Sequence, residues 1–325
     1  MISRHWHHSL GIRPAEIPTV RLFFLHHFLL GIGTILVYVA ANVTLLEHHP
    51  ETSLPLAYLI GALATLAVGK LYGYFEHHLP MNRLTVGVLL VVTALTLVVV
   101  TLVAFGHSVT SAIALMVAYR LIYLLTSLEF WGVSAVVFDV RQGKRLFSII
   151  SSGDMPAKAL GALLTVLVHS PQALEILLIG AFAAFGLSIL LLLKTFRSHR
   201  ITPGHRSTWR HRLQPTLIRH LFGGNRLIYV MSMSLLSIAV VAAGIEYAFF
   251  VYVKHQFHNQ ASLIQTIGLV LALTYLAAMG VKLLLSRRAI DRLGMKRLLL
   301  LLPAAALAAV SGYWLVGPAG LVLYF

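Results

Sequence analysis

Long runs of apolar residues, separated by short polar segments, follow one another along almost the whole chain. Runs such as VGVLLVVTALTLVVVTLVAF lack the alternation of a β-strand and are typical of helices, whose backbone polar groups are satisfied internally. About 20 residues of this kind are enough to cross a bilayer core about 30 Å thick. We therefore predict about nine membrane spans, at 21–45, 55–75, 85–105, 110–139, 145–168, 172–195, 226–253, 261–285 and 297–315.

The composition supports the same class. Of the 325 residues, 58% are hydrophobic and only 11% are charged, which is more apolar surface than one soluble core of this size can bury. Residues 1–20 are polar, so we expect no cleavable signal peptide before the first span. The chain has no cysteine, which excludes disulfides and thiolate chemistry. We predict an all-α polytopic membrane protein.

The net charge of +15 raises the question of a nucleic-acid partner, but the basic residues follow the predicted topology. With a cytoplasmic N-terminus, all but three of the 25 Lys and Arg residues lie in cytoplasmic segments, and the exceptions are Lys254, Arg120 and Lys158. This bias, together with attraction to anionic membrane lipids, accounts for the charge. We expect no nucleic-acid partner and predict a multi-pass protein of a bacterial inner membrane.

The order of the spans indicates two helical bundles. Six spans, a basic polar stretch and then further spans are the layout of a carrier whose halves are joined by a cytoplasmic linker. We assign a cytoplasmic N-terminal segment to 1–20, a six-helix bundle to 21–195, the linker to 196–225 and the start of a second bundle to 226–325. Only about three spans follow the linker, so the second bundle is predicted to be incomplete.

Two stretches resemble known membrane transporters. SRRAIDRLGMKR, with Asp291, Arg292, Lys296 and Arg297, resembles the D-R-x-G-x-[KR]-[KR] loop of the major facilitator superfamily. FWGVSAVVFDVRQGKRLFSIISSG, at 130–153, resembles the F-W…FD-x-R-x-x-[KR]-R-L-F…G segment of the ATP:ADP antiporter, or bacterial and plastid nucleotide transporter, family. The resemblance implies a major-facilitator-like fold and alternating-access transport of a nucleotide or another phosphorylated anion.

The same resemblance leaves an alternative open. The family also contains bacterial members fused to soluble HEAT-repeat or cyclic-nucleotide-binding domains. The chain would then be a non-transporting membrane sensor or anchor for such domains beyond residue 325.

Charged residues inside the spans are the candidates for binding an anion. At 1.5 Å per residue, Lys158 lies about 20 Å along the fifth span and Arg120 about 15 Å along the fourth, so both are near mid-membrane. A charge there costs at least about 2.5 kcal/mol, which makes a functional role the default. We predict that Arg120 and Lys158 converge on one cavity and contact an anion, Arg120 through its planar fork and Lys158 as a point charge.

Asp154 stands one helical turn before Lys158, so it is placed to pair with the lysine until an anion displaces it. The alternative is a static ion pair that locks two helices together. On the fourth span Tyr123 and Trp131 share a semi-polar stripe with Arg120 and are candidates for stacking on a base or for ordinary packing. Glu129 is expected to anchor the inner end of that span.

Glu246 is the only acid well inside the seventh span. It is a candidate for proton coupling or substrate contact, and a gate pair with Lys254 is the alternative.

Two cytoplasmic clusters are predicted to form charge networks between helices, with solvated loops as the alternative. They comprise Asp139, Arg141, Lys144 and Arg145, and Asp291, Arg292, Lys296 and Arg297. The 17 histidines, including the pair 26–27, lie mostly at predicted span ends, where we expect interfacial anchoring. No H-E-x-x-H, Walker or nucleophile-elbow pattern occurs. We therefore predict no metal, no cofactor and no enzymatic activity.

The charge bias makes a prediction about topology. Residues 196–225 and 286–297 should be cytoplasmic, and 46–53 and 254–260 external. Because the chain has no cysteine, single cysteines can be introduced and labelled without background. A cysteine at position 205 should react with an impermeant reagent only from the cytoplasmic side, and labelling only from the outside would contradict the predicted orientation.

Overall fold

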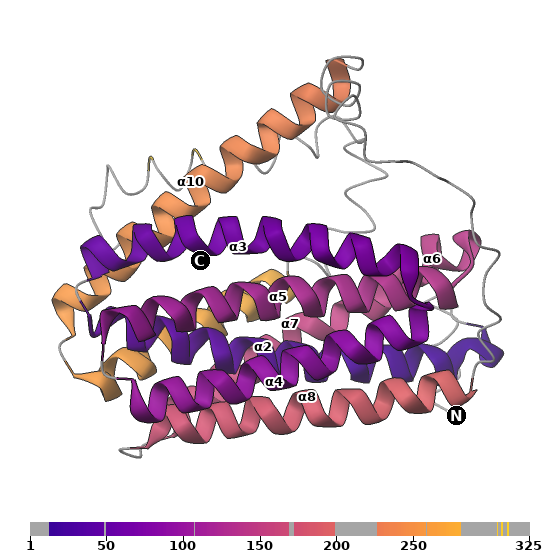
Figure 1. Ribbon diagram of the computed structural model, residues 1–325, viewed down its shortest axis with the longest axis horizontal. Helices are drawn as coiled ribbons and strands as arrows, with labels where there is room; N and C mark the ends of the chain where they lie inside the picture. Colours follow the sequence, from indigo (N-terminus) through magenta and orange to yellow (C-terminus); the bar gives the residue numbers. More distant parts are fainter. Residues whose placement is uncertain are drawn as a thin grey trace. The chain divides into compact units, whose positions relative to one another are not determined.

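The computed structural model describes residues 13–48, 50–106, 108–168, 172–198, 226–257 and 259–280, with positions 304, 307 and 311. These residues are almost entirely helical, and no strand occurs among them (Figure 1). The chain divides into two compact units. The first comprises Met1–Thr202 and Val253–Lys282, and the second Pro203–Tyr252 and Leu283–Phe325.

The helices reproduce most of the predicted spans. Within the first unit they are η1 (Pro14–Glu16), α2 (Ile17–Leu46), α3 (Pro50–His78), α4 (Met81–Phe105), α5 (Val109–Val137), α6 (Val140–Ile150), η2 (Ser151–Gly153), α7 (Asp154–Leu167), α8 (Ala173–Ser198) and a helix over Gln260–Gly280. Helix α10 (Arg226–Gln256) lies mostly in the second unit. Among the described residues, seven helices are long and apolar enough to cross a membrane, which is the pattern of a multi-pass membrane protein. The ninth predicted span, 297–315, falls almost wholly outside the described residues.

The predicted span 145–168 is not one continuous α-helix, because a 3₁₀ turn interrupts it at residues 151–153. Helix α6 ends at Ile150, a 3₁₀ turn follows, and α7 begins at Asp154. Pro156 explains the break, since its ring lacks an N–H and would clash with the carbonyl of residue 152 in a continuous helix. At 1.5 Å per residue, α6 and α7 are about 16 and 21 Å long, so neither alone crosses a bilayer core.

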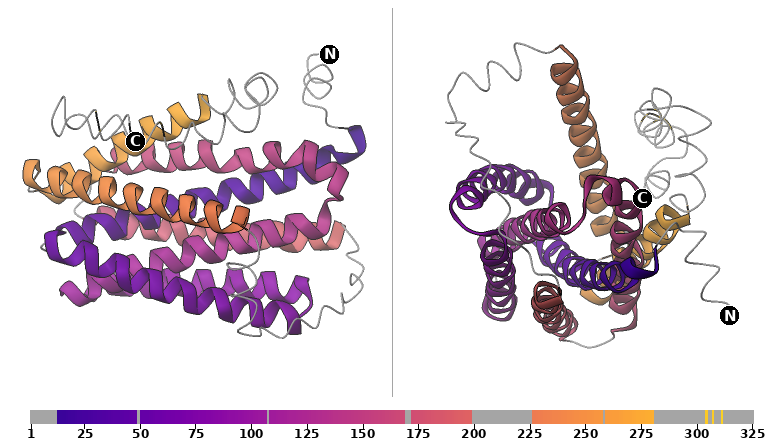
Figure 2. Two further views of the ribbon diagram at one scale, coloured as in Figure 1. Left: turned by 90° about the horizontal axis from the view of Figure 1, so that it is seen from above. Right: turned by 90° about the vertical axis from the view of Figure 1, so that its right-hand side faces the viewer.

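Helix α2 is the central element of the first unit. It runs among the other helices of this unit (Figure 2) and contacts α5, α7 and α8. Its residues are buried almost without interruption from Leu30 to Leu46. The helices around it turn large apolar side chains outward, for example Leu63 and Leu66 on α3 and Leu190 on α8, each more than 60% exposed. An outward apolar surface surrounding a buried central helix is what contact with lipid requires.

Small residues let the break approach α2. A Cβ added at Gly153 would come within 2.6 Å of the Phe24 carbonyl oxygen and 3.3 Å of the Phe28 nitrogen. Both atoms belong to the α2 backbone and have little freedom to move aside. The glycine therefore fixes how closely the broken helix packs against α2.

We predict that Gly153→Ala destabilises the protein by about 1–3 kcal/mol, as overpacking against backbone does. Gly186→Ala on α8 is the matched control, because a Cβ there meets nothing within 4 Å. The control should keep or slightly raise stability, since alanine favours helix over glycine by about 1 kcal/mol. Thermal unfolding of the detergent-solubilised proteins measures both effects. Equal melting temperatures for wild type and Gly153→Ala would contradict the close approach.

Candidate functional site

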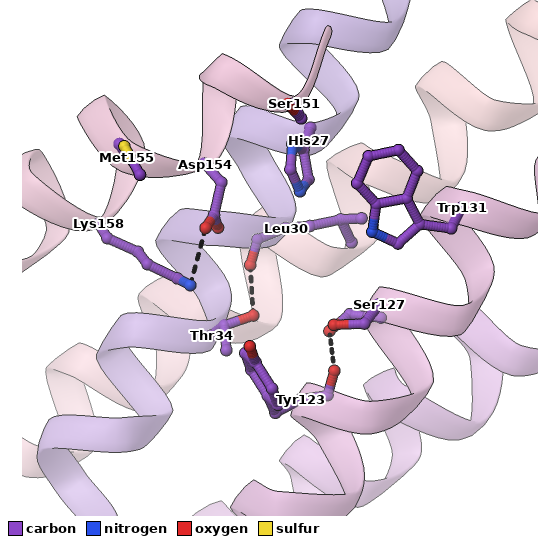
Figure 3. Close-up of a pocket in the computed structure, with 11 residues that line it drawn as sticks. His27, Leu30, Thr34, Tyr123, Ser127, Trp131, Ser151, Asp154, Met155 and Lys158 are labelled. Carbon is purple, nitrogen blue, oxygen red and sulfur yellow. Dashed lines mark hydrogen bonds and ion pairs between the residues drawn. The ribbon is translucent and has the colours of Figure 1, made fainter. Parts of the chain in front are cut away.

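A cavity of about 270 Å³ lies between α2, α5 and the broken helix (Figure 3). Its lining combines polar, aromatic and charged side chains: His27, Leu30 and Thr34 from α2; Tyr123, Thr126, Ser127 and Trp131 from α5; Ser151 from η2; and Asp154, Met155 and Lys158 from α7. The cavity thus opens where the fifth predicted span is interrupted. Irregular backbone at membrane depth is tolerated where it lines such a cavity.

The central feature of the cavity is an ion pair. Lys158 Nζ lies 2.8 Å from Asp154 Oδ2, so the expected pairing one turn apart is present (Figure 3). The lysine side chain is 13% exposed and the aspartate side chain 28% exposed. Gly31 on α2 makes room for the carboxylate, because a Cβ at that position would come within 3.0 Å of Asp154 Oδ1. The pair therefore packs directly against the central helix.

Lys158 lies near the middle of the bundle. Its Nζ stands 5.4 Å from the ring centroid of Tyr123, the central residue of α5, and 5.6 Å from that of Tyr275. The negative faces of aromatic rings attract a cation, so both rings add to the stabilisation by Asp154. The mid-membrane depth predicted for Lys158 stays a prediction.

Arg120 does not line this cavity, whereas Lys158 does. The prediction that the two cations converge on one cavity is therefore wrong. The guanidinium carbon of Arg120 lies 5.2 Å from the Tyr58 ring centroid on α3 and 6.0 Å from the Tyr119 ring centroid. Gly61 lies beside its aliphatic stem, with 3.4 Å between an added Cβ and Arg120 Cγ. The helix α5 turns Arg120 toward α3, whereas Tyr123, three residues on, faces the cavity.

The other residues predicted on α5 do line the cavity. Tyr123 and Trp131 are each nearly half exposed, and both border the space around the ion pair. Trp131 also meets Phe130 and Phe147 edge-on, at 5.3 and 5.7 Å between ring centroids. The cavity therefore offers one paired cation, two aromatic rings and several hydroxyl groups to a ligand.

The remaining predicted residues lie elsewhere. Glu246 is half-buried on α10, in the second unit. The cluster Asp291, Arg292, Lys296 and Arg297 falls outside the described residues. In the other cluster, Asp139 precedes α6 and its backbone N–H donates to Gln142 Oε1, while Arg141 is exposed. Lys144 belongs to the same helix.

One member of that cluster does join two elements. Arg145 Nη2 donates to both carboxylate oxygens of Glu16, at 2.6 and 2.8 Å, and Gln142 donates to the same carboxylate at 3.3 Å. This network ties α6 to the turn that precedes α2. The predicted charge network between elements is therefore present at Arg145. Its partner, Glu16, was not predicted from the sequence.

The structure corrects the predictions for two interior residues, His26 and Glu129. His26 was expected at a membrane interface and Glu129 at the inner end of its helix, but their side chains are 4% and 0% exposed and form a contact of 3.0 Å. The helix starts at Pro14 and Ile17 rather than near residue 21, which places His26 inside the bundle. Because the two residues are 103 positions apart, no local spacing in the sequence indicates that they form a pair.

Comparisons of the chain with family models, with curated proteins and with solved structures found no match. Within the described part of the chain, no group of three or more His, Asp or Glu side chains is placed to hold a metal ion. The geometry of the cavity and the resemblance of residues 130–153 are therefore the two grounds for a functional proposal.

We predict that Arg145→Ala destabilises the protein by about 1 kcal/mol, because it removes both bonds to Glu16 and leaves a largely buried carboxylate with fewer donors. Arg141→Ala, which removes an exposed charge from the same helix, should leave stability within about 0.5 kcal/mol of wild type. Thermal unfolding at low and high salt compares the two, and only the Arg145 effect should exceed the error. Equal effects would contradict a specific pair with Glu16.

Proposed function

We propose that this chain is the membrane part of a secondary transporter that moves a phosphorylated anion by alternating access. The observation that carries the proposal is the cavity at the broken helix, where the partly buried Lys158 is held by Asp154. A cation at membrane depth that borders a cavity is most simply explained by a substrate of opposite charge. Lys158 is the anion contact in this proposal, and Asp154 is the competing acid.

The resemblance of residues 130–153 to nucleotide transporters narrows the proposed substrate to a nucleotide of the ATP or ADP kind. Tyr123 and Trp131 would contact its base or sugar, since aromatic faces suit such stacking. Arg120 is not among the proposed contacts to the nucleotide, because it lies against Tyr58. A single paired cation suits one phosphate group, so the cavity accounts for one phosphate of the proposed ligand.

The proposed architecture is major-facilitator-like, with the first six predicted spans as one bundle and residues 226–325 as the start of another. The proposed location is a bacterial inner membrane with a cytoplasmic N-terminus. Seven apolar helices and the positive-inside bias support this arrangement. Alternating access requires helices that change their packing, and a helix already divided at residues 151–153 is suited to such a change.

The two members of the ion pair are predicted to behave differently when substituted. Lys158→Ala should weaken binding of inorganic phosphate or ADP by about tenfold or more, equivalent to about 1.4 kcal/mol, because a charge-assisted contact is lost. Asp154→Asn should keep or increase affinity, because the competing acid is gone. Ligand-induced shifts in the thermal unfolding of the purified full chain measure both.

Arg120→Gln is the matched control, because it removes a cation that lies outside the cavity. It should leave the ligand-induced shift unchanged even if it lowers the melting temperature itself. A static ion pair would instead make Lys158→Ala and Asp154→Asn equally destabilising without altering either ligand response. That result would contradict the transport site and favour a membrane anchor.

A further inference from the structure

A second buried couple lies behind the cavity and joins three helices. His26 on α2 is almost completely buried, with Nδ1 3.2 Å from the Ser188 carbonyl oxygen on α8. Its Nε2 lies 3.0 Å from Oε2 of Glu129 on α5. Helix α2 packs against both partner helices, so the imidazole bridges α8 and α5 through the centre of the first unit.

The partners of the ring determine how many protons the couple holds. A backbone carbonyl only accepts, so Nδ1 must carry a proton that it donates to Ser188. The contact between Nε2 and Oε2 also requires one proton, since two acceptors would repel each other. The couple is then either imidazolium with carboxylate or imidazole with carboxylic acid. Both forms have the same number of protons and no net charge.

One atom of the couple has no hydrogen-bond partner in the part of the chain that the structure describes. Oε1 of Glu129 is buried and accepts no hydrogen bond from the described residues. Burying a polar atom in this way costs free energy, and such an atom in a native structure calls for an explanation. A carboxylate oxygen in this position is where an additional proton can bind.

Few other titratable groups face the couple from the elements packed around it. On α2 the adjoining residue is His27; α3 contributes Tyr72, which donates to the Leu128 carbonyl at 3.5 Å, and Glu76, one turn further along the same helix. Helix α7 contributes Asp154 and Lys158, already paired with each other. Arg120, on α5 itself, lies against Tyr58 of α3. The remaining charged residues of these elements stand on α2, in or near the terminal turns of α4 and α8, and on η1 and α6: Arg21, Arg83, Glu175, Lys194, Arg197, Glu16, Arg141 and Arg145.

The couple adjoins the proposed anion cavity through two neighbouring residues. His27, next to His26, lines the cavity, and its Nδ1 also has no partner among the described residues. Its ring stacks on Phe130, the neighbour of Glu129, with 3.8 Å between ring centroids. A change of charge on the couple therefore occurs directly behind the anion site.

We propose that the His26–Glu129 couple is a proton-binding site that couples proton movement to anion movement, which rests on the proposed transport function. Starting from imidazolium and carboxylate, one incoming proton forms an O–H bond at Glu129 Oε1 and gives imidazolium and carboxylic acid. The charge of the couple rises from zero to +1. This positive charge attracts an anion to the adjoining cavity, and by linkage the bound anion favours the proton to the same extent.

The proton site is tested by infrared difference spectroscopy of the full chain in detergent, over about pH 5 to pH 8, the range around physiological pH. We expect a carbonyl band of a buried protonated carboxylic acid that appears as the pH falls and shifts when glutamate is ¹³C-labelled. Glu129→Gln should lack the band, and Glu16→Gln, which removes an acid near the helix start, should keep it.

A wild-type spectrum without a labelled band in this interval would overturn the proton site, even if Glu129→Gln fails to fold. The same holds if the band persists unchanged in a folded Glu129→Gln protein. Both results would leave the couple as a static link between α2, α5 and α8.

Coupling is tested separately by the binding of inorganic phosphate at several pH values. When the pH is lowered, the phosphate affinity of the wild type should increase by a factor about ten times larger than that of Glu129→Gln. Protonation of phosphate itself affects both proteins equally and cancels in this comparison. Identical pH dependence in the two proteins would overturn coupling. Absence of phosphate binding at every pH would contradict the proposed function and coupling together, whereas the infrared band would still decide the proton site.

Discussion

The hydrocarbon interior of a bilayer offers no hydrogen-bond partner, so every polar group placed there must find one within the protein. This constraint explains the main features of the first unit. Backbone groups are satisfied within helices, and threonine hydroxyls such as those of Thr34 and Thr96 donate to the carbonyl four residues earlier. The two buried charged couples, Asp154–Lys158 and His26–Glu129, each combine a potential cation with a potential anion. The bundle can therefore contain ionisable groups with little net charge inside it.

Helix α2 links the two couples. It supplies His26 to one couple, and it supplies the space at Gly31 that receives the carboxylate of the other. Helix α7 approaches it over small residues, since a Cβ at Gly31 would come within 2.8 Å of Ala157 Cβ. A rearrangement of either couple must change how α2 packs against its neighbours. In a closely packed interior such changes occur between discrete arrangements rather than by gradual deformation.

The positions of the spans could be predicted from the sequence, because the length of an apolar run directly reflects the thickness of the membrane. A kink near Pro156 could be predicted, since proline removes a backbone donor from a helix. The 3₁₀ turn at residues 151–153 could not, because the residues on both sides are apolar enough to form one helix. The pair Asp154–Lys158 was predictable, since partners one turn apart share a helix face whatever the tertiary fold. Arg120 and Glu129 were not, because their neighbours depend on how α5 is rotated against α2 and α3. No local spacing encodes that rotation.

The distance in sequence between His26 and Glu129 has a consequence for biogenesis. At a synthesis rate of about 5–20 residues per second, the chain from His26 to Glu129, a separation of 103 positions, takes about 5–20 s to make. During that interval α2 has left the ribosome while its acidic partner does not yet exist. A histidine suits this order, since the neutral imidazole can wait at modest cost near lipid or within the insertion machinery. Glu129 arrives on the later helix as the neutral carboxylic acid, whose proton completes the couple with the imidazole already in place. The order of the two residues along the chain therefore lets the nascent protein avoid an unpaired charge in the membrane.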